Sequence, residues 1–129
     1  MKNKNKTLLF LVDDDALFLK SLEIEFTQGE GTSVKTFATG EQCLESITQK
    51  PDAVILDYQL NSIDDRSING LETLDRIKIA NPLIPVIILS SQNKIEVAVD
   101  CMKHKAYDYI IKSETALTQL QNNLANIIP

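Results

Sequence analysis

Four short apolar segments, each followed directly by charged or hydroxyl side chains, constrain the fold of this chain more than any other feature. The clearest covers residues 53–56 and ends on Asp57, and the others cover residues 8–12, 86–89 and 109–111. A short, continuous apolar segment bounded by polar or turn residues is typical of a strand buried on both faces, as in a parallel sheet. The sequence therefore predicts a sheet whose central strands are covered on both sides.

Helical patterns separate these segments. Residues of the helix-capping type stand where the first three helices should begin: Asp14 or Asp15, Thr39 with Gln42, and Asn69 with Glu72. The second helix should run through Ile47, further helices should cover residues 93–102 and begin at Ser113, and a weaker strand should cover residues 33–37. This alternation predicts an α/β fold with a doubly wound, five-stranded parallel sheet in a three-layer α/β/α arrangement.

The residues that follow the strands predict where the functional site lies. In an open α/β sheet, ligands bind just outside the carboxyl ends of the strands. The four apolar segments deliver these side chains to that edge: Asp13, Asp14 and Asp15; Asp57; Ser90 and Ser91; and Lys112. Several carboxylates brought together repel one another unless a cation joins them, so a hard divalent ion is the simplest resolution.

Taken together, these motifs resemble the receiver domain of response regulators in two-component phosphorelay systems. The likeness extends from about Thr7 to Ile127, and four motifs carry it: Val12-Asp13-Asp14, Ile55-Leu56-Asp57, Leu89-Ser90-Ser91 and Tyr109-Ile110-Ile111-Lys112. Any one of them is common, but all four in order and in register are specific. The resemblance implies a flavodoxin-like sheet of order 2-1-3-4-5, in which Asp14 and Asp57 meet at the switch point between strands one and three.

The resemblance also implies a role for each residue of the acidic site. Asp57 would be the phosphoryl acceptor, because a carboxylate can form an acyl phosphate when a metal neutralises the developing charge. The implied cofactor is Mg²⁺, held directly by Asp14 and Asp57, by the backbone carbonyl of Gln59, and through water by Asp13. Asp15 matches no ligand of the family, and we interpret it as a charge that complements the helix dipole.

Three further residues receive roles in the same way. Lys112 would pair with Asp57 before phosphorylation and with a phosphoryl oxygen afterwards. Ser90 would donate its hydroxyl to the phosphoryl group, and Tyr109 would be the aromatic residue that changes rotamer in the switch. Each residue alone has an ordinary explanation: a turn Asp, a solvated Lys, a core Tyr. The hydroxyl of Ser91 suits a helix N-cap better than a catalytic role.

The resemblance leaves alternative functions to weigh. The leading hypothesis is a phosphorelay switch that accepts a phosphoryl group from a sensor histidine kinase or a phosphotransfer protein and catalyses no more than its own phosphotransfer and autodephosphorylation. The second is a pseudo-receiver, an interaction module of the same fold that works without phosphate. A flavodoxin-like cofactor binder or a small phosphohydrolase is disfavoured, because no glycine-rich phosphate loop follows the first strand.

Length and composition limit the remaining possibilities. The 129 residues fit a single receiver domain, 1–129, with an ordered core of about 7–127. The formal net charge of −5 argues against direct nucleic-acid binding. Since no segment looks like a signal peptide or membrane span, we expect a cytoplasmic protein without membrane association. Cys43 and Cys101 fall in helical patterns and should be buried thiols.

Several positions depart from the family pattern or call for separate interpretation. The polar loop over residues 58–69 is longer than usual and should be the most mobile part of the site rim. Ser113 follows Lys112, where the family commonly has proline, so that a cis bond there is in question. Lys105 stands where a glycine often closes the fourth helix. We interpret His104 as a cation at that helix end and not as a phosphohistidine.

The fourth helix is also expected to carry a face on which apolar residues recur at helical spacing: Ile95, Ala98, Val99 and Met102. By resemblance, the surface formed by the fourth helix, the fifth strand and the fifth helix would be used for dimerisation or for contact with an output partner.

Overall fold

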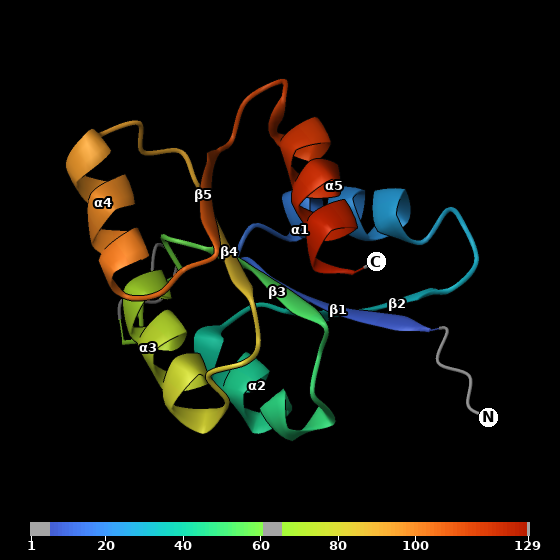
Figure 1. The fold of residues 1–129 in the computed structure, drawn as a ribbon, viewed down its shortest axis with the longest axis horizontal. Helices are drawn as coiled ribbons and strands as arrows, with labels where there is room; N and C mark the ends of the chain where they lie inside the picture. Colours follow the sequence, from blue (N-terminus) through green and yellow to red (C-terminus); the bar gives the residue numbers. More distant parts are fainter. Residues whose placement is uncertain (1–5, 61–65, 129) are drawn as a thin grey trace.

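The computed structural model describes residues 6–60 and 66–128. The described residues form a five-stranded parallel sheet with the order β2-β1-β3-β4-β5, so the predicted order is confirmed (Figure 1). The strands are β1 (Thr7–Val12), β2 (Thr32–Phe37), β3 (Ala53–Asp57), β4 (Val86–Ser90) and β5 (Asp108–Ile111). Each strand lies within one residue of its expected bounds.

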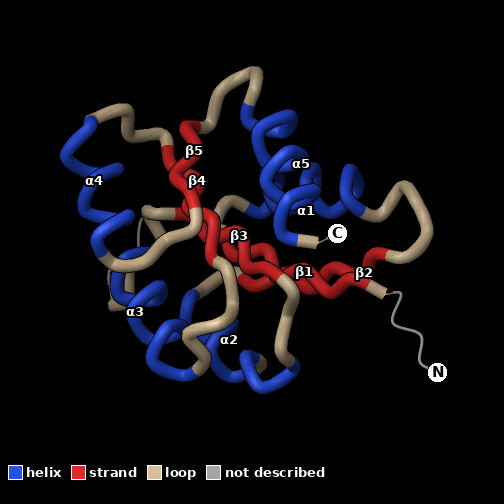
Figure 2. Tube along the Cα trace, in the orientation of Figure 1, coloured by secondary structure: helices blue, strands red, loops and turns tan. Residues whose placement is uncertain are grey.

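Helices cover both faces of the sheet. They are α1 (Ala16–Phe26), α2 (Gly40–Glu45), α3 (Gly70–Ala80), α4 (Ile95–Lys103) and α5 (Ala116–Ile127), with a short 3-10 turn, η1 (Ile47–Gln49). Figure 2 shows α1 and α5 on one side of the sheet and α2, α3 and α4 on the other. The predicted three-layer arrangement is therefore confirmed.

The core consists of two layers that share the central strands. Every residue of β3 and β4 is buried, and because successive side chains of a strand point to opposite faces, each strand feeds both layers. Val54 and Leu56 pack with the layer of α2, α3 and α4, whereas Ile55 packs with the layer of α1 and α5. Continuous apolar segments are what such two-sided burial requires.

Local side-chain bonds begin the first three helices as predicted. Asp15, and not Asp14, caps α1: its Oδ1 accepts from the backbone N–H of Leu17 at 3.1 Å and of Phe18 at 3.2 Å. The hydroxyl of Thr39 caps α2 and the side-chain oxygen of Asn69 caps α3. Each cap satisfies an N–H that has no partner inside its helix.

Two helix bounds differ from the sequence prediction. The α-helical part of α2 ends at Glu45, because the chain tightens into η1, which contains Ile47. The fifth helix begins at Ala116 and not at Ser113. The hydroxyl of Ser113 accepts from the N–H of Thr115 at 3.3 Å, so this serine forms a local turn that competes with helix formation.

Helix α4 differs from the prediction in its start, and its apolar face is exposed. It begins at Ile95 and not at residue 93. Its expected apolar face exists but is uncovered: Ile95 is 76% exposed and Val99 is 47% exposed, whereas Cys101 on another side of the helix is fully buried. Helical periodicity identifies an apolar face, but it does not say whether anything covers that face.

The end of α4 shows how the chain manages without the expected glycine. Lys105 adopts a left-handed conformation with φ of 76°. Its N–H donates to the carbonyl of Met102 at 3.0 Å, and the N–H of Ala106 donates to the carbonyl of Cys101 at 3.1 Å. This pair of bonds is the Schellman motif, which usually employs glycine at the position that Lys105 occupies.

Other expectations have mixed outcomes. Both cysteines are buried, as predicted, and the bond between Lys112 and Ser113 is trans. The loop over residues 58–69 includes residues 61–65, which lie outside the described part of the chain, so its expected mobility stays a prediction. Across residues 6–60 and 66–128, no helix has the length and apolar character needed to cross a membrane.

Candidate functional site

Three carboxylates meet where β1 and β3 end side by side. Parallel pairing places Val12 opposite Leu56. The residues that follow them, Asp13 and Asp57, therefore lie next to each other at the carboxyl ends of the two strands. Asp13 is 3% exposed and Asp57 is 4% exposed. Together with Asp14 they offer carboxylate oxygens that all lie within 4.8 Å of one another. The predicted convergence of these three residues is therefore present.

Lys112, which follows the edge strand β5, completes the cluster. Its Nζ lies 3.0 Å from Oδ2 of Asp13 and 3.4 Å from Oδ1 of Asp57. The backbone N–H of Lys112 donates to the carbonyl of Ser90 at 2.8 Å, which ties the end of β5 to the end of β4. One ammonium thus bridges two buried carboxylates, and side chains from the ends of β1, β3 and β5 share one site, which the backbone of Ser90 joins to β4.

The balance of charge in this site is unfavourable to a second negative carboxylate. Burial, followed by the charge of Asp13, raises the pKa of Asp57 from 3.8 to about 6, although Lys112 and a hydrogen bond from the Gln59 backbone oppose the shift. Burial lowers the pKa of Lys112, but Asp57 and Asp13 outweigh it and leave that pKa above its ordinary value. Lys112 therefore stays protonated, and a further cation would relieve the remaining repulsion.

The donor set fits a magnesium ion. Mg²⁺ prefers hard oxygen ligands and retains several waters, so a few carboxylates suffice. Oδ1 of Asp13 already accepts from the backbone N–H of Asp15 at 2.9 Å, and its Oδ2 faces Lys112. Both oxygens of Asp13 are thus engaged, which favours a water-mediated role for this residue. The contribution of the Gln59 carbonyl stays a prediction.

Ser90 and Tyr109 are joined through the backbone of Gln92. Ser90 ends β4 and is fully buried, and its Oγ accepts from the N–H of Gln92 at 2.9 Å. The hydroxyl of Tyr109, which is partly buried, donates to the carbonyl of Gln92 at 2.7 Å. The two proposed switch residues therefore hold the same peptide segment. Their roles in a switch stay predictions.

The N-cap interpretation of Ser91 is wrong. Helix α4 begins four residues later, with Lys94 at the cap position. The hydroxyl of Ser91 instead donates to Oε1 of Gln59 at 3.1 Å. This bond links the loop after β3 to the loop after β4.

Gly70 is a site residue that the sequence reasoning missed. Its N–H donates to the carbonyl of Tyr58 at 3.0 Å, next to the acidic cluster. A Cβ on Gly70 would lie 2.6 Å from Cα of Tyr58 and still closer to the carbonyl oxygen of Asp57. The only available signal was a glycine directly after the Asn69 cap, where helix propensity alone does not favour glycine.

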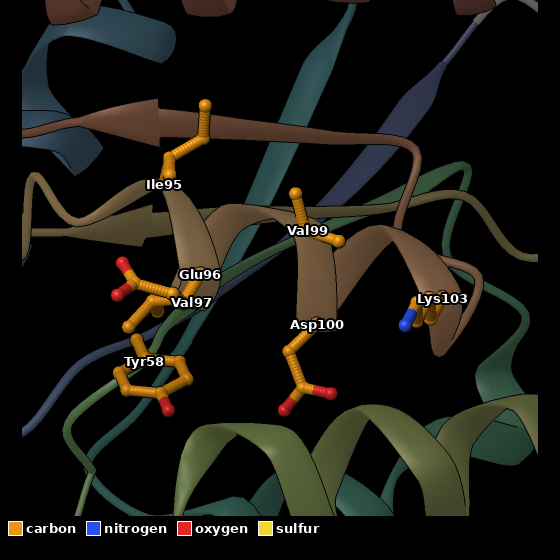
Figure 3. Close-up of a pocket in the computed structure, with 7 residues that line it drawn as sticks. All are labelled: Tyr58, Ile95, Glu96, Val97, Val99, Asp100 and Lys103. Carbon is orange, nitrogen blue, oxygen red and sulfur yellow. The ribbon is translucent and has the colours of Figure 1, made fainter.

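A groove of about 550 Å³ runs beside the site, between the Tyr58 side chain and α4. Figure 3 shows the side chain of Asp100 extending from α4 toward α3, while those of Ile95 and Val99 point the other way. At the end of α4, Nδ1 of His104 lies 2.7 Å from Oδ1 of Asp75 in α3. That hydrogen bond raises the pKa of His104, which favours our interpretation of this residue as a structural cation.

The chain has a doubly wound sheet with three carboxylates and a lysine gathered at the carboxyl ends of its strands. These features define the class of α/β proteins that bind charged groups at the switch point of the sheet. The family model for the response regulator receiver domain matches residues 9–125. This chain belongs to the family of response regulator receiver domains.

Individual relatives agree with this assignment. The chain is 43% identical over 103 residues to a "Putative response regulator NtrX-like" of Rickettsia typhi, covering 79% of this chain and 21% of that protein. It is 34% identical over 106 residues to the "DNA-binding transcriptional regulator NtrC" of Klebsiella pneumoniae, covering 81% and 21%. The structure of the receiver domain of NtrX from Brucella abortus matches with a TM-score of 0.73 at 28% identity, over 91% of this chain and 98% of that one.

The chain spans about a fifth of the length of the curated relatives it matches. As a receiver domain, it is a module of two-component phosphorelay signalling. Such domains bind Mg²⁺ at an acidic pocket, which corresponds to Asp13, Asp14 and Asp57 here.

Proposed function

We propose that residues 1–129 act as one receiver domain in which Asp57 accepts a phosphoryl group from a sensor histidine kinase or a phosphotransfer protein. The main support is the convergence of Asp57 with Asp13, Asp14 and the ammonium of Lys112 at one sheet edge. An isolated turn aspartate would not be buried beside another carboxylate, because burial of like charges is unfavourable.

The chemistry needs an ionised Asp57. With a pKa of about 6, its carboxylate is mostly ionised at neutral pH. One carboxylate oxygen attacks the phosphorus atom of the donor, the bond from phosphorus to the donor nitrogen breaks, and its electron pair stays on the donor imidazole. The product is an acyl phosphate on Asp57. Hydrolysis of this bond by the same site is the only other reaction we assign to the domain.

Asp14 and Asp57 would hold Mg²⁺ directly, with the carbonyl of Gln59 as a further ligand and Asp13 acting through water. When bound, the ion would neutralise charge on the phosphoryl oxygens. Lys112 supplies a second positive charge, since it already contacts Asp57 and can pair with a phosphoryl oxygen after transfer.

The response to phosphorylation would pass through Ser90 and Tyr109. A phosphoryl group adds acceptor oxygens beside Asp57, so the hydroxyl of Ser90 gains by donating to it. Ser90 would then turn away from the N–H of Gln92. The carbonyl of Gln92 accepts from the hydroxyl of Tyr109, so the loss of the Ser90 bond would also affect Tyr109. The change would reach the surface of α4, β5 and α5.

This surface offers apolar side chains to a partner. Ile95, Val99 and Met102 on α4 are exposed, as is Ile111 at the end of β5. Apolar side chains gathered on neighbouring elements are typical of interaction sites. We assign the face to dimerisation or to contact with an output partner, and the domain itself to no direct contact with nucleic acid or membrane.

Mass spectrometry of the intact protein tests the proposal. Incubation with Mg²⁺ and acetyl phosphate should add one phosphoryl group to the parent protein and none to Asp57→Asn. The matched control is Asp52→Asn at the other end of β3, where the carboxylate accepts from the N–H of Leu8 at 2.8 Å. Asp52→Asn should be phosphorylated like the parent. Phosphorylation of Asp57→Asn to the same extent would overturn the assignment.

A further inference from the structure

The ammonium of Lys112 has a third neighbour, which is not a carboxylate. Its Nζ lies 4.5 Å from the centroid of the Phe18 ring in α1. A cation within about 6 Å of an aromatic centroid, over the ring face, is attracted by the ring quadrupole. Lys112 is thus held between two carboxylates and one aromatic face, and both Asp13 and Phe18 come from the N-terminal part of the chain.

The same short turn that carries the acidic residues places this ring. The N–H of Asp15 donates to Oδ1 of Asp13 at 2.9 Å, and Oδ1 of Asp15 accepts from the N–H of Phe18 at 3.2 Å. Leu17, one residue earlier, is 85% exposed, whereas Phe18 packs against the core layer of α1 and α5. Two hydrogen bonds therefore couple the backbone of Phe18, from which the ring projects, to the Asp13 carboxylate.

An aromatic face suits an ammonium that has to change partners. A lysine side chain has many rotamers, so holding it in one place has an entropic cost. The ion pair with Asp57 loses its negative partner when the carboxylate becomes an acyl phosphate. Attraction to a ring face does not depend on that partner. The ring can thus keep the ammonium near the site while its hydrogen-bond partners are exchanged.

We propose that Phe18 is a positioning residue for Lys112, which keeps the ammonium beside Asp57 before and during phosphoryl transfer. This inference rests on the proposed role of Lys112 at Asp57. Phe18 touches neither the donor nor the acceptor, and it acts through the lysine. The ring also shields one side of the ammonium from water, which strengthens the attraction of the ammonium to the carboxylates.

Three variants test the proposal. Phe18→Leu keeps an apolar side chain but removes the aromatic face, whereas Phe18→Tyr retains the face. The matched control is Phe26→Leu, which makes the same change at the last residue of α1, against the same core layer. The first measurement is the NMR shift of the Lys112 ε-methylene protons without phosphodonor, and the second is the rate of phosphorylation by acetyl phosphate with Mg²⁺.

The ε-methylene protons should be shifted upfield by the ring in the parent, in Phe18→Tyr and in Phe26→Leu, and the shift should be lost in Phe18→Leu. Phosphorylation of Phe18→Leu should be about two- to fivefold slower, the change expected for loss of one cation–π contact that is still partly open to water. Phe18→Tyr should restore the parent rate.

Three results would overturn the inference: an unchanged Lys112 shift in Phe18→Leu, a lost shift with an unchanged rate, or equal slowing in Phe26→Leu. If no protein, including the parent, were phosphorylated, the proposed function would fail, and the inference with it. The shift would then still show whether the ring holds Lys112, so the two failures are distinguishable.

Discussion

Gly70 and Tyr58 lie in such close backbone contact that no side chain fits between them. The N–H of Gly70 donates to the carbonyl of Tyr58 at 3.0 Å, and a Cβ on Gly70 would lie 2.6 Å from Cα of Tyr58. This contact joins the start of α3 to the residue that follows Asp57. The first turn of α3 therefore helps to set the position of the carboxylate that we propose as phosphoryl acceptor.

Gly70→Ala should destabilise the protein by about 2 to 4 kcal/mol, because the neighbouring atoms are backbone and have to shift as a unit. The displacement would also move Asp57, so phosphorylation by acetyl phosphate should slow. Urea unfolding and the phosphorylation rate measure the two effects. Gly29→Ala is the control, since a Cβ there would meet nothing within 4 Å, and equal destabilisation by both variants would contradict the prediction.

Lys105→Gly should stabilise the protein by about 1 kcal/mol. The left-handed conformation of Lys105, with φ of 76°, is unfavourable for any residue with a Cβ and costs glycine nothing comparable. Lys103→Gly, at the last residue of α4, should instead destabilise by about 1 kcal/mol. Thermal or urea unfolding of the two variants would give changes of opposite sign, and a loss of stability in both would contradict our account of the helix end.

Metal-free protein should become more stable when Asp57 is neutralised at pH 7. The pKa of Asp57 is about 6 in the folded protein, above its ordinary value of 3.8, so the folded state binds the proton more tightly than the unfolded state. This group therefore favours folding below its unfolded pKa, and the contribution is lost as the pH rises through about 6.

The measurement is urea unfolding of the parent and of Asp57→Asn in the presence of a chelator, between pH 4 and pH 8. The stability advantage of Asp57→Asn should be largest at pH 7 and above, and should shrink as the pH falls through about 6. Addition of Mg²⁺ at pH 7 should stabilise the parent more than the variant. A constant difference across this range would show that Asp57 does not titrate as stated.

Asp14→Ala should weaken Mg²⁺ binding more than Asp13→Ala does. Direct coordination contributes more than a contact through water, and both oxygens of Asp13 are already engaged by Asp15 and Lys112. Calorimetric titration of the two variants with Mg²⁺ at pH 7.5 provides the comparison. The reverse order of affinities would exchange the direct and the water-mediated roles.

Ser90→Ala should leave phosphorylation possible but reduce the conformational response. Its hydroxyl is the group expected to move toward the phosphoryl oxygens, and a ligand shifts an equilibrium only through its differential affinity for the two states. NMR shifts of Tyr109 and of the α4 amides, with and without beryllofluoride and Mg²⁺, measure the response. If the parent resonances did not change at all, the pseudo-receiver alternative would be favoured.

The fold was predictable because its main signals are local. Continuous apolar segments identify strands buried on both faces, and N-cap residues such as Thr39 and Asn69 predict where helices begin. The three carboxylates and Lys112 were predictable for a related reason, since parallel strands bring their carboxyl ends to one edge. Local bonding also explains why α5 begins at Ala116 and not at the predicted Ser113, because the side chain of Ser113 forms a turn instead.

The features that escaped prediction depend on contacts between distant segments. Nothing near Gly70 in the sequence reveals that Tyr58 will lie against it, and nothing near Phe18 reveals the ammonium above its ring. The apolar pattern of α4 alone does not reveal that its face is uncovered, and only the family resemblance suggested a contact surface there. Such features follow from tertiary structure and not from periodicity.

The turn that begins with Asp13 has a consequence for how this family can vary. Within six residues it supplies two carboxylates to the site, the Asp15 cap of α1 and the ring beside Lys112. One inserted residue after the cap would rotate Phe18 by roughly 100° around the helix axis, since an α-helix has 3.6 residues per turn. Insertions should therefore be far rarer here than in the loop between β3 and α3, where extra length leaves these contacts intact.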